Sequence, residues 1–537
     1  MARTFDHTQS PPAAAYSSNP IPVVDVFAGP GGLGEGFSAI RSETGHPRFR
    51  VCLSIEKDPR AHRTLQIRSF WRQFLLDTVP TAYYGFLRGD ITQEELFKRF
   101  PLQAKQATTQ AWLAELGRVS RGAVRTRIQS ALSGAHPWVL IGGPPCQAYS
   151  IVGRSRNKGN EKYKPEKDNR HRLYRQYLKI IADHWPAVFV MENVKGLLSS
   201  TLKKERIFER VLSDLKTPAK AMSSRSPLKA ESPAHTYQLH SLVERTMFSD
   251  GRPEQFVVRS ELYGIPQARH RVILVGIRDD LSCTPLGTLK RFPPVAAGSV
   301  LDGLPKLRSR LSRLEDTQAQ WLSSLRDGLR SRWLESVRFK AGTDVHTLMV
   351  CTLQTLRVPK DDGGSEFVAC RPNVSYSSSW FIDEQLGGVC NHAARAHIVA
   401  DLFRYLYASS FAKVHGRSPD LRDFPEELLP EHKNVRKAVT EGLFDDRFRV
   451  QLRDRPAATV TSHLSKDGHY FIHPDPLQCR SLTVREVARL QTFPDNYFFA
   501  GPRTSQYIQV GNAVPPLLAK KIAEIVLELL DHADPEH

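Results

Sequence analysis

The sequence predicts an α/β fold built on a mostly parallel sheet. Five short, nearly continuous apolar runs occur between residues 23 and 277, namely "VVDVFAG", "RVCLSIE", "WVLIGG", "AVFVMEN" and "RVILVGI". Strands that are buried on both faces have this composition. Helical patterns such as "LYRQYLKIIADHW" at 173–185 separate several of the runs. Such alternation of strands and helices is typical of parallel α/β sheets.

Length and composition favour a globular protein of several domains. The 537 residues have a hydrophobic content of 40%, which suffices for a few domains of roughly 150 residues each. The seven cysteines occur singly, without a CxxC pair, and no charged-then-apolar leader opens the chain. We therefore expect reduced thiols and a cytoplasmic protein without a membrane-spanning helix, rather than a secreted disulfide scaffold.

The chain is strongly basic. Its 75 Lys and Arg residues outnumber 56 Asp and Glu residues, which gives a formal net charge of +19. Cationic side chains bind polyphosphates by neutralising charge and releasing counterions. The charge therefore favours a nucleic acid as the partner, although some basic proteins carry such a charge without one.

Changes in the sequence pattern divide the chain into four parts. Residues 1–20 lack periodicity and are rich in Pro, Ser and Ala, which is typical of a disordered arm. Residues 21–280 carry the alternation of strands and helices, interrupted at 216–235 by a Ser- and Pro-rich stretch that is predicted to be a solvated loop. The alternation is lost over 281–450, which predicts a separate domain of mixed structure. Helical patterns return over 451–537.

Two helices are predicted near the C-terminus. Thr483 is placed to cap the first of them, whose apolar positions Val484, Val487, Ala488 and Leu490 share one face. The second, "PPLLAKKIAEIVLELL", is amphipathic and has Pro at its start, which a helix N-terminus tolerates.

A glycine-rich turn follows the first predicted strand. The stretch "DVFAGPGGLGEGF" at 25–37 contains Gly29, Gly31 and Gly32 and opens a helix. Glycine lets the backbone turn tightly and approach a ligand closely, although such a turn can also serve only helix–sheet packing. Glu56 ends the second predicted strand, where a carboxylate suits ribose hydroxyls. Together these features indicate a cofactor that contains adenosine.

A cysteine stands at the end of a third predicted strand. In "WVLIGGPPCQAYS" the apolar residues 138–141 lead through two glycines and two prolines to Cys146. The prolines restrict the backbone and remove two amide donors, so the thiol begins a loop instead of packing inside. The loop 151–172 is rich in Lys and Arg, and positive charge lowers the pKa of a thiol and favours the nucleophilic thiolate. A lone cysteine is more often a small core residue, but this position favours a reactive one.

Glu192 is predicted to lie in the same crevice as Cys146. It follows the fourth predicted strand in "VMENV", and the helical stretch 173–185 lies between the two residues. A right-handed crossover brings both to the carboxyl edge of the sheet, beside the glycine turn.

Six stretches, taken in order, resemble the motifs of the DNA (cytosine-5) methyltransferases. They are "DVFAGPGGLGEGF", "GGPPCQAYS", "MENV", "YGIPQARHRVILVGIR", "LTVREVARLQTFPDNY" and "QVGNAVPP", and they cover about 21–280 and 450–525. The resemblance implies a Rossmann-like domain that binds S-adenosylmethionine, formed by 21–280 and completed by 451–537. It also implies that 281–450 is an inserted target-recognition domain. The implied reaction is methyl transfer to carbon 5 of cytosine in a specific double-stranded DNA sequence.

The resemblance also assigns roles to residues. Cys146 adds to carbon 6 of the base and Glu192 contacts ring N3. Arg269 and Arg271 of "QARHR" face the active site to hold the base oxygen, a phosphate or the cysteine loop. The target base must leave the duplex, at an unstacking cost on the order of a few kcal/mol. The residues expected around the cofactor are Phe27, Gly29, Gly31, Gly32, Glu56, Asp90, Pro145 and Asn512.

Asp90 has the weakest support among these residues. In "RGDI" it is placed to bind an adenine amino group, but an exposed Asp in a turn has the same local sequence. The chain departs from compact members of the family at 60–87 and 91–137, where Trp-, Arg- and Phe-rich insertions separate the motifs.

No metal is expected. Cys390, His392 and His397 of "CNHAARAH" resemble a ligand cluster, but no second group with ligand spacing accompanies them.

Other functions account for less of the sequence. An RNA cytosine-5 methyltransferase is the main alternative, and the long segment 281–450 argues against it. A dinucleotide-dependent dehydrogenase leaves "PPCQ" and "MENV" unexplained, and a catalytically idle DNA-binding relative would be expected to lack Cys146 or Glu192. Because the chain combines recognition and catalysis without a chromatin-reading module, we expect a prokaryotic modification enzyme of a restriction or defence system. Its expected partners are double-stranded DNA and a cognate restriction endonuclease or other defence subunit.

Overall fold

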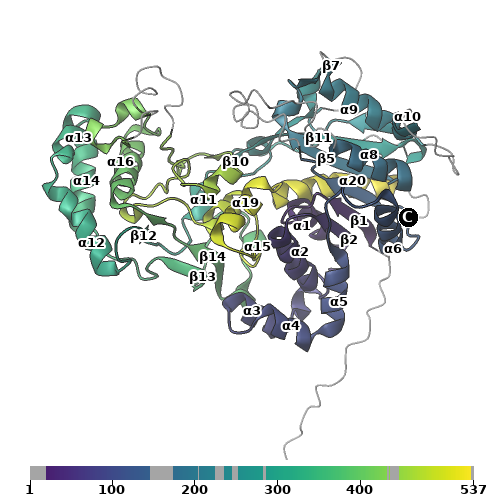
Figure 1. Ribbon diagram of the computed structural model, residues 1–537, viewed down its shortest axis with the longest axis horizontal. Helices are drawn as coiled ribbons and strands as arrows, with labels where there is room; N and C mark the ends of the chain where they lie inside the picture. Colours follow the sequence, from purple (N-terminus) through teal and green to yellow (C-terminus); the bar gives the residue numbers. More distant parts are fainter. Residues whose placement is uncertain are drawn as a thin grey trace, which may run out of the picture.

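A mixed β-sheet forms the right-hand part of the molecule in Figure 1. The computed structural model describes residues 20–145, 173–202, 205–223, 235–244, 252–281, 286–431, 435 and 447–533. The sheet has eight strands in the order β3-β2-β1-β4-β5-β11-β8, and β9 also pairs with β11. Its strands are β1 (Ile21–Val26), β2 (Phe49–Glu56), β3 (Ala111–Leu113), β4 (Val139–Gly142), β5 (Val188–Val194), β8 (Tyr237–His240), β9 (Val257–Arg259) and β11 (His270–Arg278).

The five apolar runs are confirmed as strands β1, β2, β4, β5 and β11. The five neighbouring strands β3, β2, β1, β4 and β5 are parallel to one another, as predicted. Strand β11, however, is antiparallel to β5, β8 and β9. Between β9 and β11 the described chain contains a 3-10 turn and a two-residue strand, and no α-helix. A short link of this kind suits antiparallel neighbours, whereas a parallel pair needs a longer crossover.

Helices cover both faces of the sheet. Because side chains alternate along a strand, Val24 and Val26 of β1 belong to a core shared with α6 (Arg121–Leu132), α8 (Leu173–His184) and α9 (Ile207–Lys216). Val23 faces the other side and packs in the core that includes α1 (Gly32–Ser38) and α20 (Pro516–Ala533). The predicted last helix is therefore confirmed as α20, and it packs on the face of the sheet to which Val23 of β1 points.

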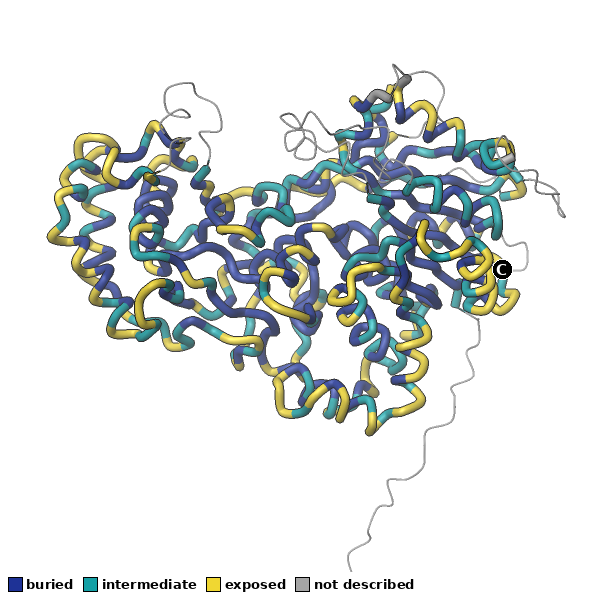
Figure 2. Tube along the Cα trace, viewed as in Figure 1, coloured by how far each residue is buried: buried dark blue, intermediate teal, exposed yellow. Residues whose placement is uncertain are grey.

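A helical lobe lies at the opposite end of the molecule (Figure 1). Its core is formed by α12 (Gln318–Arg326), α13 (Trp333–Ala341), α14 (Thr343–Thr355) and α16 (Val399–His415). Figure 2 shows that buried segments continue from the sheet through the centre of the molecule to α16.

The centre is built from segments far apart in the sequence. One core combines α11 (Gly298–Leu301), α15 (Ser378–Phe381), α18 (Val484–Leu490) and α19 (Arg503–Asn512). The predicted cap of α18 is confirmed, because the Thr483 hydroxyl accepts a hydrogen bond from the Glu486 amide and the Glu486 carboxylate accepts one from the Thr483 amide.

The stretch between β2 and β3 is helical. It contains α2 (Pro59–Trp71), α3 (Thr81–Arg88), α4 (Gln93–Arg99) and α5 (Pro101–Gln110), which pack with Leu386 and Cys390 in a further core. The remaining short elements are β6 (Thr201–Leu202), β7 (Glu205–Arg206), α10 (Pro218–Ser223), β10 (Gln267–Ala268), β12 (Arg310–Leu311), β13 (Gly364–Ala369), β14 (Gly388–Ala393), β15 (Ala396–His397) and β16 (Ala457–Ala458). Among the described residues, no helix combines the length and the apolar character needed to cross a membrane.

Candidate functional site

The carboxyl ends of four parallel strands bring the predicted site residues to one edge of the sheet. The glycine turn follows β1, Glu56 ends β2, the segment Gly143 to Pro145 follows β4, and Glu192 lies near the end of β5. Ligands of open α/β sheets bind at this edge. Cys146 and the basic loop 151–172 lie outside the described residues. The described segment 20–145 stops one residue before the predicted nucleophile.

The glycine turn has an irregular backbone. Phe27, Gly29 and Gly31 have φ angles of 56°, 56° and 95°, which an L-residue other than glycine rarely adopts. A Cβ added at Gly32 would lie 2.1 Å from the carbonyl oxygen of Val514, so the segment before α20 touches the turn directly. Asn512, an expected cofactor-side residue, lies two positions earlier and is exposed.

Glu56 is oriented by three backbone amides. Its Oε2 accepts from Gly29 and its Oε1 accepts from Lys57 and Asp58, each at 2.8 Å. A carboxylate oxygen has two acceptor positions, so Oε2 keeps one for a further donor. A Cβ added at Gly29 meets nothing within 4 Å, which leaves space above the turn. The arrangement suits a ribose hydroxyl.

Glu192 is ion-paired with Arg271. The Arg271 Nε lies 2.9 Å from Glu192 Oε1, and the two side chains are 16% and 13% exposed. Arg271 stands opposite Val194 in the antiparallel β5–β11 pair, two residues from Glu192 and therefore on the same face of the sheet. Two of the predicted residues are thus brought together.

The segment that leads to Cys146 packs against Glu192. A Cβ added at Gly143 would lie 3.0 Å from Glu192 Oε2. The Asn193 side chain donates to the Pro144 carbonyl at 3.2 Å. These contacts hold Gly143 and Pro144 beside the end of β5, and Pro145, expected on the cofactor side, follows them directly in the chain.

Arg269 points into the protein. Its guanidinium is buried and donates to the carbonyls of Val460 at 2.7 Å and Gly511 at 3.2 Å. Burial, together with the nearby charge of Arg271, lowers the pKa of Arg269. The side chain therefore joins two C-terminal segments, one of which leads to Asn512.

Asp90 does not join the group, which corrects the prediction of a third cofactor contact at this residue. It lies in the turn between α3 and α4, its side chain is 62% exposed, and it pairs with Arg88 at 3.3 Å. Arg88 in turn donates to the carbonyls of Gln385 and Leu386. The reason is that "RGDI" belongs to a helical insertion between β2 and β3, and β3 begins only at Ala111.

Glu115, unlike Asp90, lies close to the end of β2. It follows β3, and the preceding residue, Ala114, donates to the Glu56 carbonyl at 2.9 Å. Its carboxylate is 37% exposed and lies 3.6 Å from Lys57 Nζ and 2.8 Å from Arg118 Nε. The three-residue strand "AWL" is too short to give a periodic signal, so the sequence offers little to find it by.

Asp25, at the end of β1, is a further buried carboxylate next to the glycine turn, and none of the roles predicted from the sequence falls on it. It is 1% exposed, and neither oxygen has a well-formed hydrogen bond among the described residues. A Cβ at Gly34 would lie 3.0 Å from its Oδ2. Burial raises the pKa of Asp25 to about 7, and the charge of Arg72 only partly offsets this.

We expect Asp25→Asn to stabilise the protein above neutral pH. Because its folded pKa is raised, the native carboxyl keeps a proton that the unfolded chain loses, and wild-type stability falls between about pH 4 and 7. Urea unfolding at pH 5 and pH 8 should show the advantage of the variant growing by roughly 2 to 3 kcal/mol. An advantage that shrinks with rising pH would contradict the assignment.

The cluster of Cys390, His392 and His397 has other partners. Cys390 is buried, and burial raises its pKa to about 12. Both ring nitrogens of His392 are hydrogen-bonded, to Thr483 and to the Pro305 carbonyl, each at 2.9 Å. The nitrogens of His397 contact Ser481 and Tyr405. The ring nitrogens of both histidines are thus engaged in hydrogen bonds within the protein.

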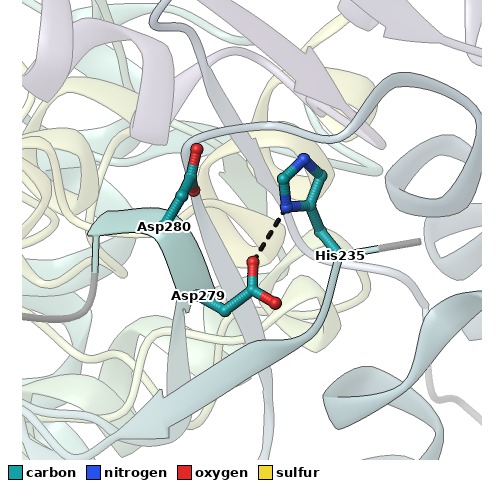
Figure 3. Close-up of side chains that lie close together, drawn as sticks. All are labelled: His235, Asp279 and Asp280. Carbon is teal, nitrogen blue, oxygen red and sulfur yellow. Dashed lines mark hydrogen bonds and ion pairs between the residues drawn. The ribbon is translucent and has the colours of Figure 1, made fainter. Parts of the chain in front are cut away.

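A different group, His235, Asp279 and Asp280, has ligand atoms within 4.8 Å of one another (Figure 3). Asp279 Oδ1 pairs with His235 at 2.8 Å and its Oδ2 accepts from Thr236. Asp280 is held by two donors of Arg278 at 2.7 and 2.8 Å. The carboxylates are therefore already engaged, and they lie at the opposite end of β11 from Arg271.

Comparisons with known proteins agree on one family. The model of the C-5 cytosine-specific DNA methylase family matches residues 109–218 and 392–528. The chain is 31% identical to the Type II methyltransferase M.Bpa9945I of Bacillus paralicheniformis, over 95% of this chain and 99% of the relative. It is 26% identical to a putative type II methyltransferase of Oceanobacillus iheyensis, M.OihORF3336P, over 94% of each. It is 27% identical to the DNA (cytosine-5-)-methyltransferase M.ApeKI of Aeropyrum pernix, over 75% of this chain and 83% of the relative.

Proposed function

Because the chain belongs to the C-5 cytosine-specific DNA methylase family, we propose that it transfers a methyl group from S-adenosylmethionine to carbon 5 of cytosine in double-stranded DNA. The observation that carries the proposal is the Glu192–Arg271 pair packed against the segment Gly143 to Pro145. This pair lies at the carboxyl edge of the sheet, beside a glycine turn that suits an adenosine-bearing cofactor.

The residues around the turn fit S-adenosylmethionine. Glu56 would hold the ribose, since three amides fix its carboxylate and one acceptor position remains open. Glu115, in place of Asp90, would bind the adenine amino group. The other residues proposed for this pocket are Phe27, Gly29, Gly31, Gly32, Pro145 and Asn512. The bound cofactor supplies an electrophilic methyl group.

The protein must make carbon 5 of the base nucleophilic. We assign to Cys146 the addition of its thiolate to carbon 6, which moves electron density toward carbon 5. Arg271 engages Glu192 Oε1, so Oε2 is the oxygen left to contact ring N3. After methyl transfer, loss of the carbon-5 proton and elimination of the thiolate restore the aromatic ring and the free cysteine. Arg269 acts at a distance, by holding the Gly511 carbonyl near Asn512.

Reaction requires the base to leave the duplex, and contacts with the DNA must offset the unstacking cost. We assign these contacts to the basic loop 151–172 and to a recognition domain at 281–450, between the catalytic segments 21–280 and 451–537. Phosphate contacts give affinity, while side chains in the major groove give sequence choice. One relative is named a Type II methyltransferase and another a putative one, which supports a role in restriction–modification with a cognate endonuclease as partner.

Mapping of 5-methylcytosine at base resolution tests the proposal. The purified chain is incubated with S-adenosylmethionine and unmethylated genomic DNA, and we expect methylation confined to one short sequence. Total RNA is treated in parallel. Methylation of RNA but not of DNA would favour the alternative, an RNA cytosine-5 methyltransferase, and methylation of neither would contradict the proposed reaction.

A further inference from the structure

The glycine turn has few internal hydrogen bonds. Within the turn, Gly31 donates to the Ala28 carbonyl at 2.9 Å, and Ala28 donates to Ile55 of β2 at 3.2 Å. Pro30 has no amide hydrogen. A backbone with three left-handed residues in five positions needs support from outside to keep one conformation.

That support comes from Tyr497, far away in the sequence. Its hydroxyl donates a hydrogen bond to the Pro30 carbonyl. A Cβ added at Gly31 would lie 3.0 Å from the same hydroxyl oxygen, so the ring end packs directly on the turn. Tyr497 is fully buried, and burial raises its pKa, so the hydroxyl keeps its proton and remains a donor.

A buried ion pair packs against the Tyr497 ring. The Arg68 guanidinium lies 4.9 Å from the centre of that ring and 3.7 Å from the centre of the Trp71 ring. Its Nε donates to Glu35 Oε2 at 2.9 Å. Glu35 belongs to α1, the helix that the glycine turn opens, and the adjacent guanidinium groups lower its pKa to about 2 against the effect of burial. The ring is thus tied to both the turn and its helix.

The loop that carries Tyr497, residues 494–497, is itself held firmly. Arg485 is fully buried and donates to the Pro494 carbonyl at 2.7 Å and to the Tyr497 carbonyl at 2.6 Å. Asp495 is paired with Arg489 at 2.6 Å, and both side chains are fully buried. Buried groups with satisfied polar contacts resist movement, so the loop can act as a rigid support.

We propose that the loop 494–497 is a brace that holds the glycine turn in its cofactor-binding form, with Tyr497 as a positioning residue. The inference rests on the proposed function, because the turn is the expected cofactor site. Tyr497 itself would touch no reacting atom. Loss of the Tyr497 hydroxyl should therefore change the affinity for the cofactor and the protection of the turn amides from hydrogen exchange, and not the affinity for DNA.

The test compares Tyr497→Phe with Tyr507→Phe. Tyr507 is a close match, because it is also fully buried, its hydroxyl donates to the Leu482 carbonyl at 2.7 Å, and Arg395 lies 4.8 Å from its ring centre. Amide hydrogen exchange of residues 27–33 is measured on the full chain without cofactor. The Kd of S-adenosylhomocysteine is measured by calorimetry.

We expect Tyr497→Phe to speed exchange over 27–33 at least fivefold and to raise the Kd about tenfold, while Tyr507→Phe changes neither more than twofold. Should Tyr497→Phe not fold, Asn496→Ala provides a second variant, because Arg68 donates to Asn496 Oδ1 at 3.1 Å. We expect it to change both quantities in the same direction, about threefold.

Unchanged exchange and Kd in Tyr497→Phe, or equal changes in Tyr507→Phe, would overturn the brace. The exchange measurement needs no cofactor, so it separates two kinds of failure. A wild-type chain that binds neither S-adenosylmethionine nor S-adenosylhomocysteine would overturn the proposed function instead.

Discussion

Replacing Cys146 by alanine is expected to abolish methylation and to leave the affinity for DNA within about threefold of wild type. In the proposed reaction the thiolate forms the bond to carbon 6, and the methyl side chain of alanine cannot form that bond. DNA affinity comes mainly from phosphate contacts, which the substitution does not remove. Transfer of labelled methyl groups to DNA and a binding titration measure the two effects separately.

Cys351→Ala is the control for this experiment. Cys351 is an exposed, free cysteine on α14, in the helical lobe, and its loss should leave methylation unchanged. A duplex with 5-fluorocytosine at the target gives a second readout, because fluorine cannot leave carbon 5 as a proton does. Wild type and Cys351→Ala should form a covalent complex that survives denaturation, and Cys146→Ala should form none. Appreciable turnover by Cys146→Ala would contradict the assigned nucleophile.

The sheet could be predicted from sequence because its strands are buried on both faces. Such strands give unbroken apolar runs, and five of them mark β1, β2, β4, β5 and β11. The direction of β11 could not be predicted, since a buried strand has the same composition in either orientation. The three residues of β3 are too few to give a periodic signal, so the sequence does not single out Glu115, which follows this strand.

The central core shows a second limit of the sequence. The pattern of α18 predicts one apolar face, but Arg485 and Arg489, which are not among its apolar positions, are also fully buried. Their charges are accommodated by partners that include the Cys390 carbonyl, the Pro494 carbonyl and Asp495. A buried arginine is stable only when such acceptors surround it. The partners from other segments become visible only once the chain is folded.

The candidate site contains residues whose position could be predicted from the sequence and residues whose position could not. The alternation of strands and helices was enough to predict that Glu192 lies at the sheet edge that carries the glycine turn. The two arginines of "QARHR" look equivalent in the sequence, yet Arg271 pairs with Glu192 while Arg269 donates to the carbonyls of Val460 and Gly511. The C-terminal segments decide this difference, and their position depends on the whole fold.

Glu192→Gln is expected to lower kcat by about 10²- to 10⁴-fold, the range that a positioned acid or base contributes. Glutamine keeps the size of the side chain and its contacts with Arg271 and Gly143, but it cannot supply or take a proton at ring N3. The Kd for S-adenosylhomocysteine should stay within twofold of wild type, because Glu56 and the glycine turn are unchanged. Single-turnover methylation with saturating cofactor measures the loss.

Glu261→Gln is the matched control for this substitution. Glu261 is also partly buried, at 19% exposure, and its Oε1 lies 2.7 Å from His270 Nε2, one residue before Arg271. A purely structural effect of removing a charge near β11 should slow both variants alike. If ring N3 needs the Glu192 carboxyl group, only Glu192→Gln loses activity by orders of magnitude. Similar rates in the two variants would contradict the role assigned to Glu192.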